Sequence, residues 1–138
     1  MQQIVLAANA DADQPWVAEA AADLARQSNG EVAVICVDEL QTELLSTLPR
    51  EEVRKPAEAA AQRAVDRLRA EGIEATMTVR SGPALERILE YADEVDADVI
   101  VVGSSVRGRM KTALLGSVPI GLINRSKRPV LAITAPSS

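Results

Sequence analysis

Short apolar runs alternate with amphipathic stretches along the whole chain, and this alternation limits the fold more than any other feature. The runs of strand length are IVLAA (4–8), EVAVICV (31–37), IEATMTVR (73–80), ADVIVVG (97–103) and PVLAIT (129–134). Between them, apolar residues recur at helical spacing. Because strand–helix–strand crossovers are right-handed, this order predicts parallel strands with helices on both faces of the sheet.

Residues that begin and end helices mark the four stretches between the runs. The first helix is expected from Gln14-Pro15 to Ser28-Asn29-Gly30, with Asp13 placed to cap it. Residues 39–56 are interpreted as a short helix or a packed loop because Pro49 and Pro56 interrupt them, so the second helix is expected from about Pro56 to Ala70.

The last two helices have clearer apolar stripes. Ser81-Gly82-Pro83 opens the third, and Gly116 begins the fourth, according to the sequence. The residues expected to face inward are Leu85, Ile88, Leu89 and Ala92 in the third helix, and Val118, Leu122 and Ile123 in the fourth.

These elements predict one domain over residues 1–138, a doubly wound five-stranded parallel α/β sheet in the strand order 3-2-1-4-5. In such sheets ligands bind beyond the carboxyl ends of the strands, where the strand order reverses. If the first and fourth strands are neighbours, that point gathers the loop from Asn9 to Asp13, the end of the second strand at Val37, and the loop after Gly103.

Composition excludes several chemistries. Without histidine there is no Ser-His or Cys-His pair and no His-ligated zinc, and the single Cys36 fits a reducing compartment. One Trp, one Tyr and no Phe leave few stacking surfaces, and the net charge of −5 argues against nucleic-acid binding. No apolar run reaches membrane-spanning length, and the first residues lack a signal-peptide pattern, so we expect a cytoplasmic protein with no membrane partner.

Charge is unevenly distributed along the chain. No acidic residue follows Asp98, and a charge of +6 after that point leaves −11 for the first 98 residues. This asymmetry indicates either a local anion site or basic residues at a helix end and in a loop. The basic residues are Arg107, Arg109, Lys111, Arg125, Lys127 and Arg128.

The stretch VVGSSVRGRMKTALLGSV, residues 101–118, has the parts of a phosphate-binding loop. Gly103 would let the backbone turn at the end of a strand, and the free N–H groups of a helix start at Gly116 and Ser117 would suit an anion. Arg107 and its neighbouring cations could neutralise phosphate charge. The alternative is an ordinary turn, an ordinary helix start and solvated cations.

The chain resembles the universal stress protein family over nearly its whole length. The segments that carry the resemblance are IVLAANADAD, EVAVICVDEL, VRSGPALERILEYADEVDADVIVVGS and GSVPIGLINRSKRPVLAI. The nucleotide-binding branch of that family has Gly, two residues, Gly, nine residues, Gly, then Ser or Thr. Gly103 fills the first place, and Gly116 with Ser117 fills the last. The resemblance implies ATP or AMP as ligand, with Mg²⁺ accompanying ATP and no other metal.

Three positions depart from what the resemblance implies, and one of them is Ala10, which stands where the family usually has glycine. Val106 replaces the middle glycine, and a β-branched residue is poorly suited to positive φ. Asn9 replaces the aspartate that the resemblance implies after the first strand, and it brings no charge. Val37 matches the position whose main chain meets adenine. The site residues expected on this basis are Asn9, Val37, Val102, Gly103, Val106, Arg107, Gly116, Ser117 and Val118.

These departures favour a universal stress-type regulatory or interaction protein with a degenerate phosphate loop that binds ATP weakly or not at all. The alternative is a functional ATP- or AMP-binding member, with nucleotide-dependent regulation or slow ATP hydrolysis. No general base is evident near the loop, so catalysis beyond a slow ATPase is not expected. A phospho-receiver domain would need an aspartate at the end of the third strand, where Thr78-Val79-Arg80 stands.

A homodimer through residues 129–134 is also expected, because an apolar edge strand pairs readily with another chain and the family resemblance implies the same contact. The identity of a protein partner is left open. Asp11 and Asp13 could form a metal site but are interpreted as helix-capping residues. Trp16 is expected to pack in a helix stripe or to lie at the rim of the crevice, and Cys36 to be core.

Overall fold

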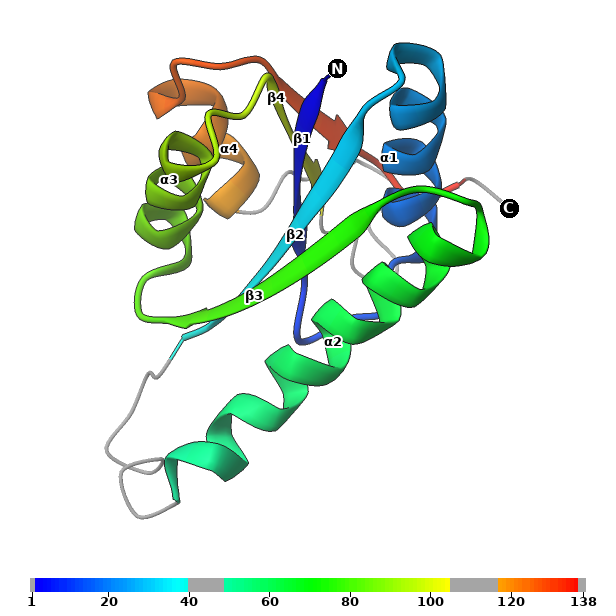
Figure 1. Ribbon diagram of the computed structural model, residues 1–138. Helices are drawn as coiled ribbons and strands as arrows, with labels where there is room; N and C mark the ends of the chain where they lie inside the picture. The colour runs from blue at the N-terminus through cyan, green and yellow to red at the C-terminus, as the bar shows by residue number, and fades with distance from the viewer. Residues whose placement is uncertain (1, 40–48, 105–116, 137–138) are drawn as a thin grey trace.

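The computed structural model describes residues 2–39, 49–104 and 117–136 (Figure 1). Its five strands form a parallel sheet in the order β3-β2-β1-β4-β5, which confirms the predicted fold class. The strands are β1 (Gln3–Ala8), β2 (Glu31–Asp38), β3 (Ala75–Ser81), β4 (Val99–Gly103) and β5 (Val130–Ile133). The helices are α1 (Pro15–Ser28), α2 (Arg50–Ala70), α3 (Ala84–Glu94) and α4 (Ser117–Arg125).

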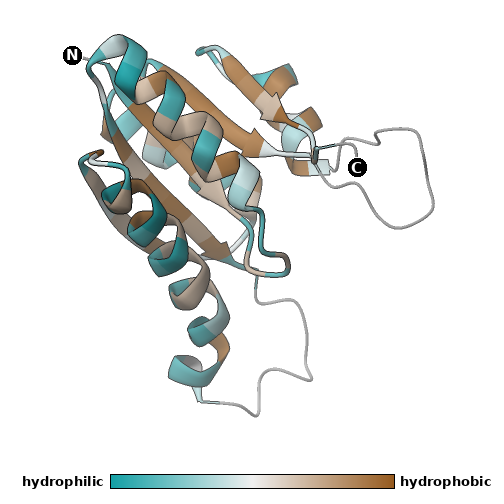
Figure 2. Cartoon of the chain, turned by 90° about the vertical axis from the view of Figure 1, so that its right-hand side faces the viewer, coloured by the Kyte–Doolittle hydropathy of each residue, from teal (hydrophilic) through white to brown (hydrophobic). Residues whose placement is uncertain are grey.

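Helices α1 and α2 cover one face of the sheet, and α3 and α4 cover the other (Figure 1). Successive strand residues point to opposite faces, so a strand covered on both sides is apolar along its whole length. In β1, Ile4 and Leu6 join the α1/α2 core, and Val5 joins the α3/α4 core. Figure 2 shows the resulting apolar strands between helices whose outer faces are hydrophilic.

Asn29 ends α1 as the sequence predicts. Its φ is 53°, in the left-handed region that Asn tolerates, and the Gly30 N–H donates to the Ala25 carbonyl at 2.8 Å. A side chain at position 30 would collide with the residue just before β1, because its Cβ would lie 2.5 Å from the Gln2 carbonyl oxygen. Glycine therefore allows β2 to start directly beside β1.

The predicted start of α2 was wrong. The helix begins at Arg50 and runs through Pro56, its seventh residue. Proline lacks an N–H, so the carbonyl four residues earlier, at Glu52, has no helical donor. Both residues are exposed, and water can serve that carbonyl instead. Half of the segment interpreted as a short helix or packed loop, residues 40–48, lies outside the described residues.

The predicted inner face of α4 was partly wrong. Pro119 and Leu122 are buried and Val118 is half-buried, but the side chain of Ile123 is 50% exposed. A short helix presents one stripe to the sheet, and the stripe through Pro119 and Leu122 turns Ile123 to the side. In the described part of the chain, no helix is both long and apolar enough to cross a membrane.

Candidate functional site

Strands β1 and β4 are hydrogen-bonded neighbours, as the sequence-based site requires. Their register pairs Ile4 with Val99 and Ala7 with Val102. Both strands run in the same direction, so Asn9, just after β1, and Gly103, the last residue of β4, lie at the carboxyl ends of the strands. The strand order reverses between β1 and β4, and open α/β sheets bind ligands beyond the carboxyl ends at that point.

The start of α1 packs directly over Gly103. A Cβ on this glycine would lie 2.5 Å from Gln14 Oε1 and 2.8 Å from Val17 Cγ2. Gln14 also reaches across the end of β4, where its Nε2 donates to the Ser104 carbonyl at 3.5 Å. The absence of a side chain at position 103 therefore serves the close approach of α1 to β4.

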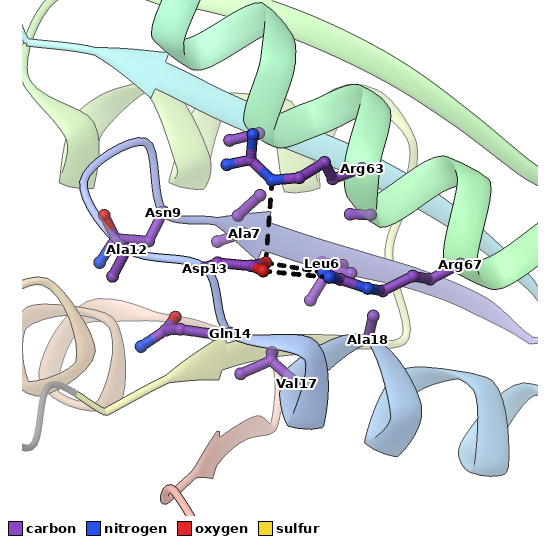
Figure 3. Close-up of a pocket in the computed structure, with 13 residues that line it drawn as sticks. Leu6, Ala7, Asn9, Ala12, Asp13, Gln14, Val17, Ala18, Arg63 and Arg67 are labelled. Atoms are coloured by element: carbon purple, nitrogen blue, oxygen red, sulfur yellow. Dashed lines mark hydrogen bonds and ion pairs between the residues drawn. The ribbon is translucent and has the colours of Figure 1, made fainter.

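Asn9 is exposed and shapes the loop between β1 and α1. Its Oδ1 accepts a hydrogen bond from the Asp11 N–H at 2.7 Å, the pattern of an Asx turn. Figure 3 shows the Asn9 carboxamide pointing away from Arg67, to the same side as the Gln14 carboxamide. One of the two lone pairs of the Asn9 oxygen is thus already used within its own loop.

The prediction that Asp13 caps α1 was wrong. Residue Gln14 holds the N-cap position without a side-chain hydrogen bond. Asp13 instead accepts hydrogen bonds from Arg67 at 2.7 and 3.0 Å, and the Nε of Arg63 lies 3.7 Å away (Figure 3). The hydrogen bonds from Arg67 lower the pKa of the Asp13 carboxyl. Two arginines one helical turn apart on α2 draw the carboxylate away from the helix start.

A cavity of about 30 Å³ lies between the β1–α1 loop, α1 and α2 (Figure 3). Its polar lining includes Asn9, Asp13, Gln14, Arg63 and Arg67, and its floor includes Leu6 and Ala64. A space of this size accommodates water. Within the described ranges, no cluster of three or more His, Cys, Asp or Glu side chains could hold a metal ion.

The other predicted site residues are placed in different environments. Val37, Val102 and Val118 all belong to or pack against the α3/α4 core, with Val102 buried and the other two half-buried. Ser117 is exposed at the first position of α4. Val106, Arg107 and Gly116, together with the cations Arg109 and Lys111, lie outside the described residues.

Sequence reasoning missed the polar contacts at the ends of β2 and β3. Asp38 is only 6% exposed, and its Oδ2 accepts a hydrogen bond from Ser81 Oγ at 2.7 Å. Its Oδ1 has no partner among the described residues. The two side chains meet because β2 and β3 pair in a register that places Asp38 opposite Ser81. Nothing in the sequence specifies that register.

Cys36 and Trp16 are packing residues in this structure. Cys36 is buried in the α1/α2 core, and burial, together with the charge of Asp11, raises the pKa of its thiol to about 11. The thiol is therefore neutral at physiological pH. Trp16 is half-buried against the same core.

The family is shown by comparison with known proteins. Residues 1–134 match the model of the Universal stress protein family, so the chain belongs to that family. The stress response protein NhaX of Bacillus subtilis is 38% identical over 55 residues, 40% of this chain and 33% of that protein. A universal stress protein of Methanocaldococcus jannaschii is 36% identical over 53 residues, 38% of this chain and 33% of that protein. The matched segments thus span about a third of these curated relatives.

Solved structures of family members resemble the whole domain. A universal stress protein from Archaeoglobus fulgidus superposes with a TM-score of 0.77 at 27% identity, covering 96% of this chain and 98% of that chain. A universal stress protein in complex with cAMP superposes with a TM-score of 0.70 at 29% sequence identity, covering 96% of each chain. The universal stress protein from Archaeoglobus fulgidus in complex with dAMP superposes with a TM-score of 0.72 at 28% sequence identity, covering 96% of this chain and 98% of that chain.

Proposed function

We propose that this protein is a universal stress-type regulatory or interaction module that works as a homodimer and binds ATP weakly or not at all. The main support is the small size of the cavity at the carboxyl end of β1, as the described residues line it. Small-molecule pockets usually measure roughly 300–1,000 Å³. The cavity beside Asn9 measures about 30 Å³, and Gln14 covers the end of β4.

The state of Asn9 supports the same proposal. An aspartate at this place would offer a charged acceptor, whereas the neutral Oδ1 of Asn9 is already bonded to Asp11. A hydrogen bond to a charged group contributes about 1.5–3 kcal/mol, which corresponds to roughly ten- to a hundredfold in affinity. Val106 adds an unfavourable side chain at the middle glycine position of the phosphate loop.

The proposed dimer forms through β5. The carbonyl of Pro129 accepts a hydrogen bond from the N–H of Ile100 in β4, and the carbonyl of Ile133 accepts one from the N–H of Ser104, just after β4. The backbone N–H and C=O groups of the alternate residues Val130 and Ala132 therefore point away from β4. Exposed apolar side chains lie on this strand and the adjacent helix: Leu131 is 41% exposed, Ile120 45% and Ile123 50%. A second copy would pair the open edge and cover these residues. A monomer in sedimentation velocity at micromolar concentration would contradict the dimer.

The alternative function is adenine-nucleotide binding with nucleotide-dependent regulation or slow ATP hydrolysis. It is favoured by the relatives whose structures contain cAMP and dAMP, which match 96% of this chain at 29% and 28% identity. In that case Ser117 at the start of α4 would donate to phosphate, and Mg²⁺ would accompany ATP.

Nucleotide content and affinity distinguish the two functions. Freshly purified protein is denatured and any released nucleotide is identified; the proposal expects none in stoichiometric amount. ATP and AMP are then titrated calorimetrically into the wild type, Val106→Gly, Asn9→Asp and the double variant. We expect the double variant to bind at least tenfold more tightly than the wild type.

A charge control is needed because Asn9→Asp adds a negative charge. Gln27→Glu makes the same charge change at an exposed position near the other end of α1 and should leave affinity unchanged. Micromolar or tighter binding of ATP by the wild type would overturn the proposal in favour of the alternative. Failure of every variant to bind would show that the loop is not a nucleotide site at all.

A further inference from the structure

The second edge of the sheet is β3, and its backbone directions follow from its pairing with β2. The Val32 N–H donates to the Glu74 carbonyl at 3.0 Å, and the Gly82 N–H donates to the Asp38 carbonyl at 3.0 Å. Along β3, residues whose backbone N–H and C=O groups point toward β2 alternate with residues whose groups point away from the sheet. The outward set is therefore Ala75, Met77, Val79 and Ser81.

Three of these four outward carbonyls are occupied by arginine side chains. Arg69 Nη2 donates to the Ala75 carbonyl at 3.0 Å, and Arg54 Nη2 donates to the Val79 carbonyl at 3.0 Å. Arg87 Nε donates to the Ser81 carbonyl at 3.2 Å. Arg54 and Arg69 come from α2 and Arg87 from α3, so the edge is approached from both faces of the sheet.

Strand addition needs those carbonyls. An incoming strand forms its ladder by donating its N–H groups to the outward carbonyls of the edge. Here it would first have to displace guanidinium donors, whose charge-assisted hydrogen bonds are stronger than those of a neutral amide. At β5 the situation differs: in the described part of the chain, no side chain donates to the outward carbonyls of Val130 or Ala132.

We propose that Arg54, Arg69 and Arg87 block the β3 edge against a second copy of this chain, so that copies pair only at β5 and assembly stops at a closed dimer. If both edges could pair, each copy would accept two neighbours and the result would be an open chain of copies. The closed dimer rests on the β5 pairing of the proposed function, whereas the block at β3 goes beyond it and is independent of β5 pairing and of nucleotide binding.

The experiment replaces the three arginines together. The edge variant carries Arg54→Gln, Arg69→Gln and Arg87→Gln. The control variant carries Arg26→Gln, Arg63→Gln and Arg125→Gln, which removes the same charge from arginines that face carboxylates instead of β3 carbonyls. Both are made in the wild type and in a Leu131→Glu background, in which pairing at β5 is impaired.

Sedimentation velocity and amide hydrogen exchange are measured on folded protein. In the wild-type background the edge variant is expected to form species of at least twice the control's mass. In the Leu131→Glu background it is expected to dimerise while the control does not. Exchange at the outward amides of Met77 and Val79 should slow at least tenfold as these species form.

An edge variant with the control's mass in both backgrounds would overturn the proposal, and so would larger species without slowed exchange at Met77 and Val79. If the triple variant does not fold, Arg69→Gln with Arg87→Gln leaves the half-buried Arg54 in place and is judged by the same two outcomes. A monomeric wild type would contradict the β5 dimer alone, because the Leu131→Glu background still tests β3.

Discussion

The two edges of this sheet have similar apolar exposure and different backbone protection. Met77 on β3 is 37% exposed and Leu131 on β5 is 41% exposed. Side chains from α2 and α3 occupy the carbonyls of β3, and Arg80 ties the strand further by stacking over Tyr91 at 5.0 Å and pairing with Glu94. Exposed apolar area alone therefore does not distinguish the two edges, whereas the occupancy of their outward backbone carbonyls does.

The largest difference between β5 and β3 is expected in the dimer dissociation constant when a charged side chain is introduced on each strand. Leu131→Glu should raise the dimer dissociation constant at least a hundredfold, because a symmetric interface would enclose two carboxylates. Met77→Glu makes the same kind of change at a similarly exposed position of β3 and should leave the constant unchanged. Sedimentation equilibrium measures both. Equal effects of the two variants would remove the distinction between the edges.

Removing a backbone N–H of β5 should also raise the dimer dissociation constant, by a smaller factor. Ala132→Pro removes an outward N–H of β5 that β4 does not use. Losing two such hydrogen bonds per dimer, at about 1 kcal/mol each, predicts roughly a tenfold or larger rise in the dissociation constant. Met77→Pro removes an outward N–H of β3 and serves as the control. Unaltered dimerisation of Ala132→Pro would mean that β5 contributes no main-chain pairing.

The protection of β3 should also appear as stability of the single chain. Arg54→Met keeps an apolar stem and removes the donor to the Val79 carbonyl, and we expect the free energy of unfolding to fall by about 1.5 kcal/mol. Arg125→Met removes an exposed ion pair with Glu86 and should change it by less than about 0.5 kcal/mol. Urea denaturation in the Leu131→Glu background separates folding from association.

The smallest effect is expected from the ion pair beside β3. Hydrogen bonds from Arg80 lower the pKa of Glu94. A lowered pKa in the folded state means that the stabilisation is present at neutral pH and is lost as the pH falls through the folded-state value. The melting temperature of Glu94→Gln should therefore lie slightly below that of the wild type at pH 7, and the two should converge below about pH 4.

The exposed Glu58→Gln on α2 is the control and should follow the wild type across this range. A difference between Glu94→Gln and the wild type that persists at low pH would show that the charge of Glu94 is not its source.

Much of the fold could be predicted because its signals are local. Continuous apolar runs predicted strands covered on both faces, and Asn29 ended α1 where its tolerance of positive φ indicated. The local signals failed at Pro56, where exposure to water allows a helix to continue past a missing N–H, and at Asp13, where Arg67 lies 54 residues away in sequence. No capping rule includes a partner that distant.

By itself the sequence determined the order of strands and helices, the family, and the chemical identity of Asn9, Val106 and the other candidate site residues. Periodicity and composition are properties of neighbouring residues, so they can be recognised before folding. Only the tertiary structure decided which carbonyls Arg54, Arg69 and Arg87 reach, and that Gln14 lies over Gly103. These contacts depend on register and helix placement, which arise when the whole core packs together.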